Sequence, residues 1–158
     1  MASGNFVFFL NSDDRVLPGA LNRLSTCAAE RPEVLIWTGG TRIFSHTQEN
    51  REVTIRTIDS SECTELSLEN VLYDTPLLSA RFIHRSVFLQ LGNIDPSFPM
   101  SSDREFMLRC ALSEVLEASL GIRVSELRMH KDSTTMHGGR RVVPPYLIEH
   151  LLMADKWL

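Results

Sequence analysis

The stretch ASGNFVFFLNSDDRVLPGAL, residues 2–21, decides the fold. At its centre, residues 6–10 form a short continuous apolar run, which is typical of a strand buried on both faces of a sheet. The run stops at the polar turn of residues 11–14, and Pro18 stands where a first helical position is expected. Leucines at helical spacing follow until Pro32. The order strand, acidic turn, helix predicts an α/β fold.

The rest of the chain continues the same alternation of strands and helices. Residues 34–37 predict a second buried strand that ends at Gly39 and Gly40, and residues 41–60 predict an antiparallel excursion. A loop with a short helix over 60–73, a strand over 77–83 and a helix over 86–91 capped by Gly92 come next. Residues 102–105 fit a capping box that starts a longer helix. We expect a single domain over residues 1–158, with one core.

Composition restricts the function classes. The chain has 158 residues, of which 43% are hydrophobic and 23% charged, and a formal net charge of -4. Acids and bases are interspersed, which argues against a broad nucleic-acid-binding face. One short basic cluster (Arg128, Lys131, Arg140, Arg141) can meet a few phosphates, but a solvated surface is the preferred interpretation.

The sequence also favours a cytoplasmic location. No run approaches the roughly 20 apolar residues that span a bilayer, and residues 6–10 lack the basic flank of a signal peptide. Cys27, Cys63 and Cys110 are odd in number and widely spaced, so they match neither a disulfide framework nor a zinc site. We therefore expect reduced thiols.

Two adjacent carboxylates, Asp13 and Asp14, follow the first strand. In open α/β sheets the carboxyl end of the strands is where ligands bind, and paired carboxylates there need a compensating charge. Mg²⁺ or Mn²⁺ with a diphosphate supplies that charge, because these cations prefer oxygen ligands. The alternative is a solvated turn that caps the following helix. The turn by itself does not decide between them.

The turn and its strand resemble the DxD segment of glycosyltransferase family 2, which has the GT-A fold. The matching positions are Ala2, Gly4, the strand at residues 6–10, Asn11, Ser12, Asp13, Asp14 and Pro18. The resemblance implies that Asp13 and Asp14 bind a divalent cation and the diphosphate of a nucleotide-sugar donor. Asn11 stands where many relatives carry the first Asp, and an amide oxygen can still act as a ligand, without charge.

The second segment, TPLLSARFIHRSVFLQLGNIDPSFPMSSDREFMLR at residues 75–109, resembles the acceptor-side block of the same family. There the family has an RxxF turn, an LGxFDxxF motif and a lone acid that opens a helix containing LR. The resemblance implies that Asp103 is the general base, which takes the proton of the acceptor hydroxyl. The helix macrodipole is expected to keep Asp103 ionised. The alternative for Asp103 is helix capping alone.

Weaker signals lie after this helix. The segment LRMHKDSTTMHGG resembles the family's loop in which a histidine approaches the diphosphate or the metal; His130 fits best and His137 is a second candidate. We expect Arg109 to pair with an acid inside the domain. Pro144 and Pro145 open a last amphipathic helix, which can pack on its own domain, on a partner or on a membrane. Its acidic polar face disfavours the membrane.

The resemblance covers nearly the whole chain but only the metal-binding and acceptor half of the family's domain. The nucleotide-binding half, which family members carry at their N-terminus, is missing from this sequence. Phe6–Leu10 is then a central strand whose missing neighbours expose a sheet edge and apolar surface. We therefore expect little donor affinity in this chain alone.

Two functions stay open. The first is an inverting glycosyltransferase, or the catalytic half of one, that uses a metal and a nucleotide-sugar donor, with surface polysaccharide as the family's common setting. The second is a non-catalytic module that oligomerises or pairs with another chain through the open sheet edge. A metal-dependent phosphatase or nuclease is disfavoured, because the further acids and the lysine of such sites are not recognisable. The sequence names neither the donor sugar nor the acceptor.

Overall fold

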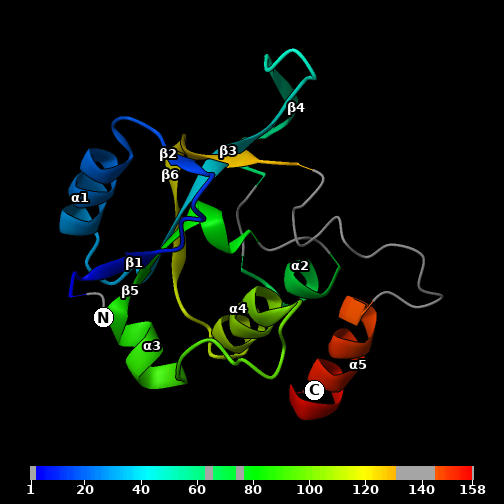
Figure 1. Ribbon diagram of the computed structural model, residues 1–158. Helices are drawn as coiled ribbons and strands as arrows, with labels where there is room; N and C mark the ends of the chain where they lie inside the picture. The colour runs from blue at the N-terminus through cyan, green and yellow to red at the C-terminus, as the bar shows by residue number, and fades with distance from the viewer. Residues whose placement is uncertain (1–2, 63–65, 74–76, 131–144, 158) are drawn as a thin grey trace.

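The computed structural model describes residues 3–62, 66–73, 77–130 and 145–157. His137, Cys63 and most of the basic cluster lie outside these residues. Figure 1 shows a curled mixed sheet flanked by helices. In chain order the elements are β1 (Phe6–Phe8), β2 (Arg15–Val16), α1 (Ala20–Glu30), β3 (Ile36–His46), β4 (Glu52–Ile58), α2 (Leu68–Tyr73), the 3-10 helix η1 (Leu78–Ala80), β5 (Arg81–His84), α3 (Arg85–Leu91), α4 (Ser102–Leu112), β6 (Glu117–Arg128) and α5 (Pro145–Trp157).

The sheet is organised around one long strand, β3. The strand order is β1-β5-β3-β6-β2, and β4 pairs with the second half of β3. β3 and β6 run parallel, whereas the other pairs are antiparallel. The first half of β3 lies between β5 and β6, and its second half lies between β4 and β6. The β3–β4 hairpin therefore projects from the rest of the sheet (Figure 1).

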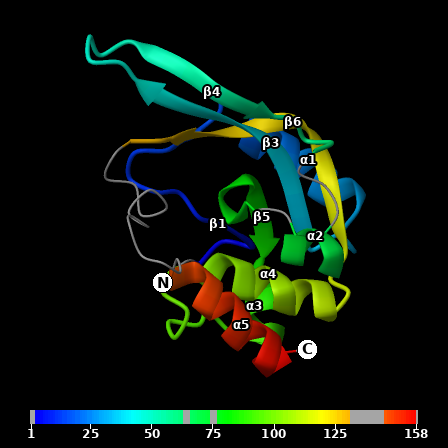
Figure 2. The ribbon, with the colours of Figure 1, turned by 90° about the vertical axis from the view of Figure 1, so that its right-hand side faces the viewer.

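Each face of the sheet has its own hydrophobic core. Successive residues of a strand point to opposite faces, so Trp37 and Phe82 pack beneath α1 while their neighbours Ile36 and Ile83 pack on the other side. The second core is the larger, and α2, α3, α4 and α5 contribute to it. Figure 2 shows α4 between the sheet and the outermost helix α5.

The predicted short helices are confirmed. α3 begins one residue before the predicted start and ends at Gly92, whose φ of 87° favours glycine. α2 lies within the predicted loop, and α5 begins at Pro145. At residues 77–83 the structure has η1 followed by β5 instead of one continuous strand.

Two expectations about strands were wrong. The first strand ends at Phe8 and is half-buried, whereas a strand over residues 6–10 buried on both faces was expected. Among the described residues it pairs with β5 and forms an edge of the sheet, which agrees with the expectation of an open sheet edge at this strand. The second strand does not end at Gly39 and Gly40 but continues to His46. A Cβ at Gly39 would come within 2.3 Å of Val124, and one at Gly40 within 2.6 Å of a backbone oxygen. The two glycines therefore allow close approach inside the sheet.

β6 is the longest element that the sequence interpretation missed, and the short β2 beside it was missed as well. This strand of 12 residues is parallel to β3 and ends at Arg128. Its apolar residues recur at every second position, 118, 120, 122 and 124, which is the period of a strand. β6 matters for the site because its last residues pair with β2, and β2 is the strand that directly follows the acidic turn.

Candidate functional site

The acidic turn is fixed to the end of β6 through Asp14. β2 pairs with β6 so that Arg15 lies opposite Glu126. Asp14 accepts hydrogen bonds from the backbone N–H of Arg128 (2.8 Å) and from the side-chain amide of Asn11 (2.8 Å). The backbone N–H of Asp14 donates to the Asn11 carbonyl at 3.2 Å. Both carboxylate oxygens of Asp14 are therefore used by the protein itself, which gives Asp14 a structural role.

Asp13 is placed differently, because its side chain faces His130. The distance from Asp13 Oδ2 to His130 Nε2 is 2.9 Å, and the two side chains are 27% and 37% exposed. His130 follows β6 by two residues, and the N–H of Met129 donates to the Phe44 carbonyl at 2.8 Å, which continues the strand's contact with β3. The structure thus brings together four predicted residues, Asn11, Asp13, Asp14 and His130.

This donor set suits a cation that takes most of its ligands from elsewhere. Within the residues that the structure describes, no group of three or more His, Cys, Asp or Glu side chains can hold a metal. Mg²⁺ in nucleotide sites uses one or two carboxylates together with phosphate oxygens and several waters. Asp13 offers one partly exposed carboxylate, and Asn11 keeps an amide oxygen. Asp13 and Asn11 would be the groups of this turn able to reach a metal held mainly by phosphate oxygens and water.

A network of ion pairs supports the turn from the side of the hairpin. Arg15 contacts Glu52 (2.6 Å) and Glu126 (3.3 Å), and Arg42 contacts the same two carboxylates at 2.9 and 2.8 Å. These contacts lower the pKa of Glu52 to about 2, chiefly through the hydrogen bond from Arg15. Both guanidinium groups also lie against the Phe44 ring. The network joins β2, β3, β4 and β6.

Sequence reasoning did not find this network. Arg15 is adjacent to the turn, but its partners lie on β4 and β6. The signal was the alternation of charged residues with apolar ones along β4, where Glu52 and Arg56 flank Val53 and Ile55. That alternation indicates a polar strand face without naming its partner.

Asp103 lies in the first turn of α4, as predicted, but apart from the acidic turn. Its Oδ1 accepts from the N–H of Arg104 at 2.8 Å. Across the described residues, no hydrogen bond or ion pair joins Asp103 to Asp13 or Asp14. The structure therefore does not bring the predicted base into contact with the predicted metal ligands.

The net shift in the pKa of Asp103 is opposite to the one expected, because desolvation outweighs the backbone N–H groups at the start of the helix. The side chain is exposed at the surface, yet neighbouring protein atoms displace part of its water, and this desolvation raises the pKa of Asp103. The N–H and the charge of Arg104 oppose the rise without cancelling it, and His150 on α5 acts in the same sense as Arg104. A raised pKa makes the carboxylate a stronger base than the dipole argument predicts.

The predicted capping box at the start of α4 was also wrong. Glu105 is fully buried, and its carboxylate accepts from Arg109 (2.7–3.1 Å) and from the indole N–H of Trp157 (3.1 Å). Ser101 precedes the helix and makes no side-chain capping bond. The expectation that Arg109 pairs with an internal acid is confirmed. A buried ion pair therefore replaces the cap, because Glu105 faces the core.

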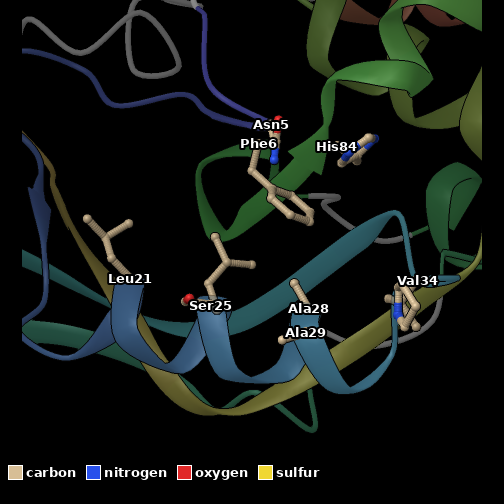
Figure 3. A pocket seen from close by; sticks show the side chains of 10 residues that line it. Asn5, Phe6, Leu21, Ser25, Ala28, Ala29, Val34 and His84 are labelled. Atoms are coloured by element: carbon tan, nitrogen blue, oxygen red, sulfur yellow. The ribbon is translucent and has the colours of Figure 1, made fainter.

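A hollow lies elsewhere, between β1 and α1 (Figure 3). It has a volume of about 520 Å³ and is lined mainly by apolar residues. Its lining comprises Asn5, Phe6, Leu21, Leu24, Ser25, Ala28, Ala29, Pro32, Val34 and His84. None of the predicted site residues lines it. Trp37 and Phe44 are 2% and 0% exposed and belong to the core.

Comparison with known proteins leaves the family open. The chain matches no protein-family model and no curated protein sequence. The resemblance to glycosyltransferase family 2 therefore stays a prediction from the two motif segments. Among the helices that the structure describes, none combines the length and the apolar character needed to cross a bilayer.

Proposed function

We propose that this chain is the metal-binding and acceptor-side part of an inverting glycosyltransferase with a partial GT-A fold. Asp13, with Asn11 and His130 beside it, holds a divalent cation and the diphosphate of a nucleotide-sugar donor. Asp103 takes the proton of the acceptor hydroxyl. The reaction would use a cytoplasmic donor and serve polysaccharide synthesis. A nucleotide-binding half supplied by another chain would complete the donor site.

The observation that carries this proposal is the contact between Asp13 and His130. The two residues are 117 positions apart, and the pairing of β2 with β6 brings them to 2.9 Å. A metal–diphosphate site needs both anionic oxygen ligands and groups that bind phosphate oxygens. The turn supplies the first, and His130 can supply the second as an N–H donor.

The chemistry assigned to Asp103 is proton transfer. As the acceptor oxygen forms its bond to the anomeric carbon, its proton moves to the Asp103 carboxylate, and the bond to the diphosphate oxygen breaks. A bound cation neutralises the charge that develops on the departing diphosphate. Desolvation raises the pKa of Asp103, which improves proton acceptance. Since Asp103 and the turn are not in direct contact, the acceptor would lie between them.

Calorimetry with Mn²⁺ and a panel of nucleoside diphosphates tests the metal site. We expect weak binding, with a Kd on the order of 1 mM, that requires the metal and is lost in Asp13→Asn. Asp59→Asn, a change at an exposed aspartate directly after β4, is the matched control. Binding that persists without metal or survives in Asp13→Asn would contradict the proposal. A low-micromolar Kd would contradict the expectation that base recognition lies outside this chain.

A second candidate function, a module that pairs with another chain through its sheet edge, is favoured by β1. The N–H of Arg85 donates to the Asn5 carbonyl, and the N–H of His84 donates to the carbonyl of Leu35, directly before β3. Because facing residues alternate in an antiparallel pair, the backbone groups of Phe6 and Phe8 point away from β5. The apolar hollow lies on the α1 side of this strand (Figure 3). A strand added there would pair with β1 and bury Leu21, which is 63% exposed.

Sedimentation of the wild-type chain and of Leu21→Lys tests this second candidate. A lysine in the hollow should abolish association through β1, whereas Leu89→Lys, at a leucine that is 79% exposed on α3, should leave it unchanged. Association that is equally strong in Leu21→Lys and the wild type would rule out the β1 interface.

A further inference from the structure

Helix α5 turns its polar residues toward the protein. Glu149 is only 8% exposed, and its carboxylate accepts the N–H of Met100 at 3.0 and 3.1 Å. Trp157 donates to the buried Glu105, and Lys156 contacts Asp95 at 2.9 Å. Together with Met153, which is 2% exposed, these contacts fix which side of the helix faces the core.

The opposite side of α5 carries an exposed apolar stripe. Leu147, Ile148, Leu151 and Leu152 are 43%, 52%, 73% and 55% exposed. Their spacing of three and four places them on one helix face. Rotation of the helix cannot bury this stripe, because it would remove Glu149 and Trp157 from their buried hydrogen-bond partners. Figures 1 and 2 show α5 as the outermost helix, beyond α4 from the sheet.

A stripe of this kind differs from ordinary surface leucines. Single exposed apolar residues such as Leu89 are common on soluble proteins and need no explanation. Four large aliphatic side chains on adjoining turns form a contiguous patch, and such patches mark interaction surfaces. The helix leaves its most apolar face exposed and buries Glu149 instead, which is consistent with a partner that covers the apolar face.

The charges around the stripe indicate the kind of partner. Asp155 is exposed and lies three and four residues after Leu152 and Leu151, so it continues the stripe at its C-terminal end. The helix's one lysine, Lys156, is paired with Asp95. Asp155 is therefore an exposed acid at one end of the stripe, and an exposed acid suits the positive end of a helix dipole.

We propose that the stripe docks against the same stripe of a second copy, with the two α5 helices antiparallel. This arrangement places Asp155 of each chain beside the first turn of the partner's helix, where the positive end of the helix dipole favours an anion. A two-fold axis brings the same patch of both chains together, and Leu151, at the middle of the stripe, then lies next to its own copy. The proposal is independent of the catalytic assignment.

Sedimentation velocity over a range of concentrations tests this interface. The wild type and Leu89→Lys should dimerise, and Leu151→Lys should be monomeric at the same concentrations. Asp155→Lys should weaken the dimer by about fivefold, in line with the size of helix-dipole effects. A monomeric wild type, or a dimer that survives Leu151→Lys, would overturn the proposal. Loss of association in Leu21→Lys alone would place the interface at β1 instead.

An engineered disulfide tests whether the two α5 helices pack antiparallel. In a Cys63→Ser background, Leu151→Cys should form an intermolecular disulfide under mild oxidation, because the two copies of residue 151 face each other. Cys27 and Cys110 are buried and so should not compete. Leu89→Cys in the same background is the control and should not crosslink. Equal crosslinking in both variants, or none at residue 151, would contradict the antiparallel pair.

Discussion

The two predicted carboxylate sites of this molecule, the acidic turn and the start of α4, were inferred in the same way but are built differently. At the turn, strand pairing brings Asp13 to His130 from 117 residues away. At α4, the hydrogen bond described for Asp103 lies within its own helix, while the neighbouring Glu105 accepts a hydrogen bond from Trp157 in the core. The comparison teaches that a motif identifies candidate residues, whereas long-range pairing decides which of them can act together.

The largest expected effect concerns the anchor of α4. Glu105→Ala removes the partner of Arg109, which is 8% exposed, and should lower the free energy of unfolding by about 3–5 kcal/mol, since an unpaired buried charge remains. Urea unfolding measures the change, and Glu30→Ala at the exposed end of α1 is the control. A loss below about 1 kcal/mol would show that the start of α4 does not depend on this ion pair.

The next effect separates the two acids of the turn by binding. Asp13→Asn should weaken the metal-dependent binding of a nucleoside diphosphate at least tenfold, about 1.4 kcal/mol. The substitution removes the carboxylate of Asp13, whereas the other carboxylate of the turn, that of Asp14, is held by backbone and amide donors. The stability of Asp13→Asn should stay within about 0.5 kcal/mol of the wild type. Thermal unfolding alongside calorimetry checks both. An unfolded Asp13→Asn protein would instead indicate a structural role.

Asp14→Ala should give the reverse pattern. Asp14 ties Asn11 and the Arg128 backbone together, so its removal should cost about 1 kcal/mol of stability. The affinity for the nucleoside diphosphate should fall only to the extent that the turn becomes less ordered. Urea unfolding of the alanine variants at both positions makes the comparison, and a larger loss of stability in Asp13→Ala than in Asp14→Ala would break the distinction.

The smallest effect is the pH dependence of Asp103. Its pKa is raised by desolvation in the folded state, so its contribution to stability is complete below the unfolded value and is lost as pH rises through the folded value. Asp103→Asn should therefore gain stability relative to the wild type as the pH rises above the ordinary aspartate pKa of about 3.9. NMR titration of the Asp103 carboxyl checks the shift directly, and a midpoint below that of an unfolded aspartate would contradict it.

Local signals in the sequence located the short elements well. Gly92 and the apolar spacing before it gave α3, and Pro145 gave the start of α5, because both depend on backbone preferences of a few residues. The grouping of Asn11, Asp13 and Asp14 followed from their adjacency. His130 was assigned to the same site through the family resemblance, and the pairing of β2 with β6 agrees with that assignment.

What the sequence did not reveal depends on distant contacts. Gly39 and Gly40 look like strand breakers, but Val124 and the backbone near Ile58 approach so closely that only glycine fits. Glu105 has the spacing of a capping residue, yet Trp157, 52 positions away, makes it a buried partner. The apolar stripe of α5 indicates a core face, whereas Glu149 and Met153 occupy the core instead.

The most direct test of the central claim is an NMR titration of the chain with Mn²⁺ in the presence of a nucleoside diphosphate. A paramagnetic ion broadens the signals nearest to it first, and this readout detects weak binding. The account predicts that Asp13, Asp14 and His130 broaden before Leu21 in the hollow and Leu151 on α5, and that Asp13→Asn abolishes the selectivity. Uniform broadening, or broadening centred away from the turn, would contradict a metal–diphosphate site there.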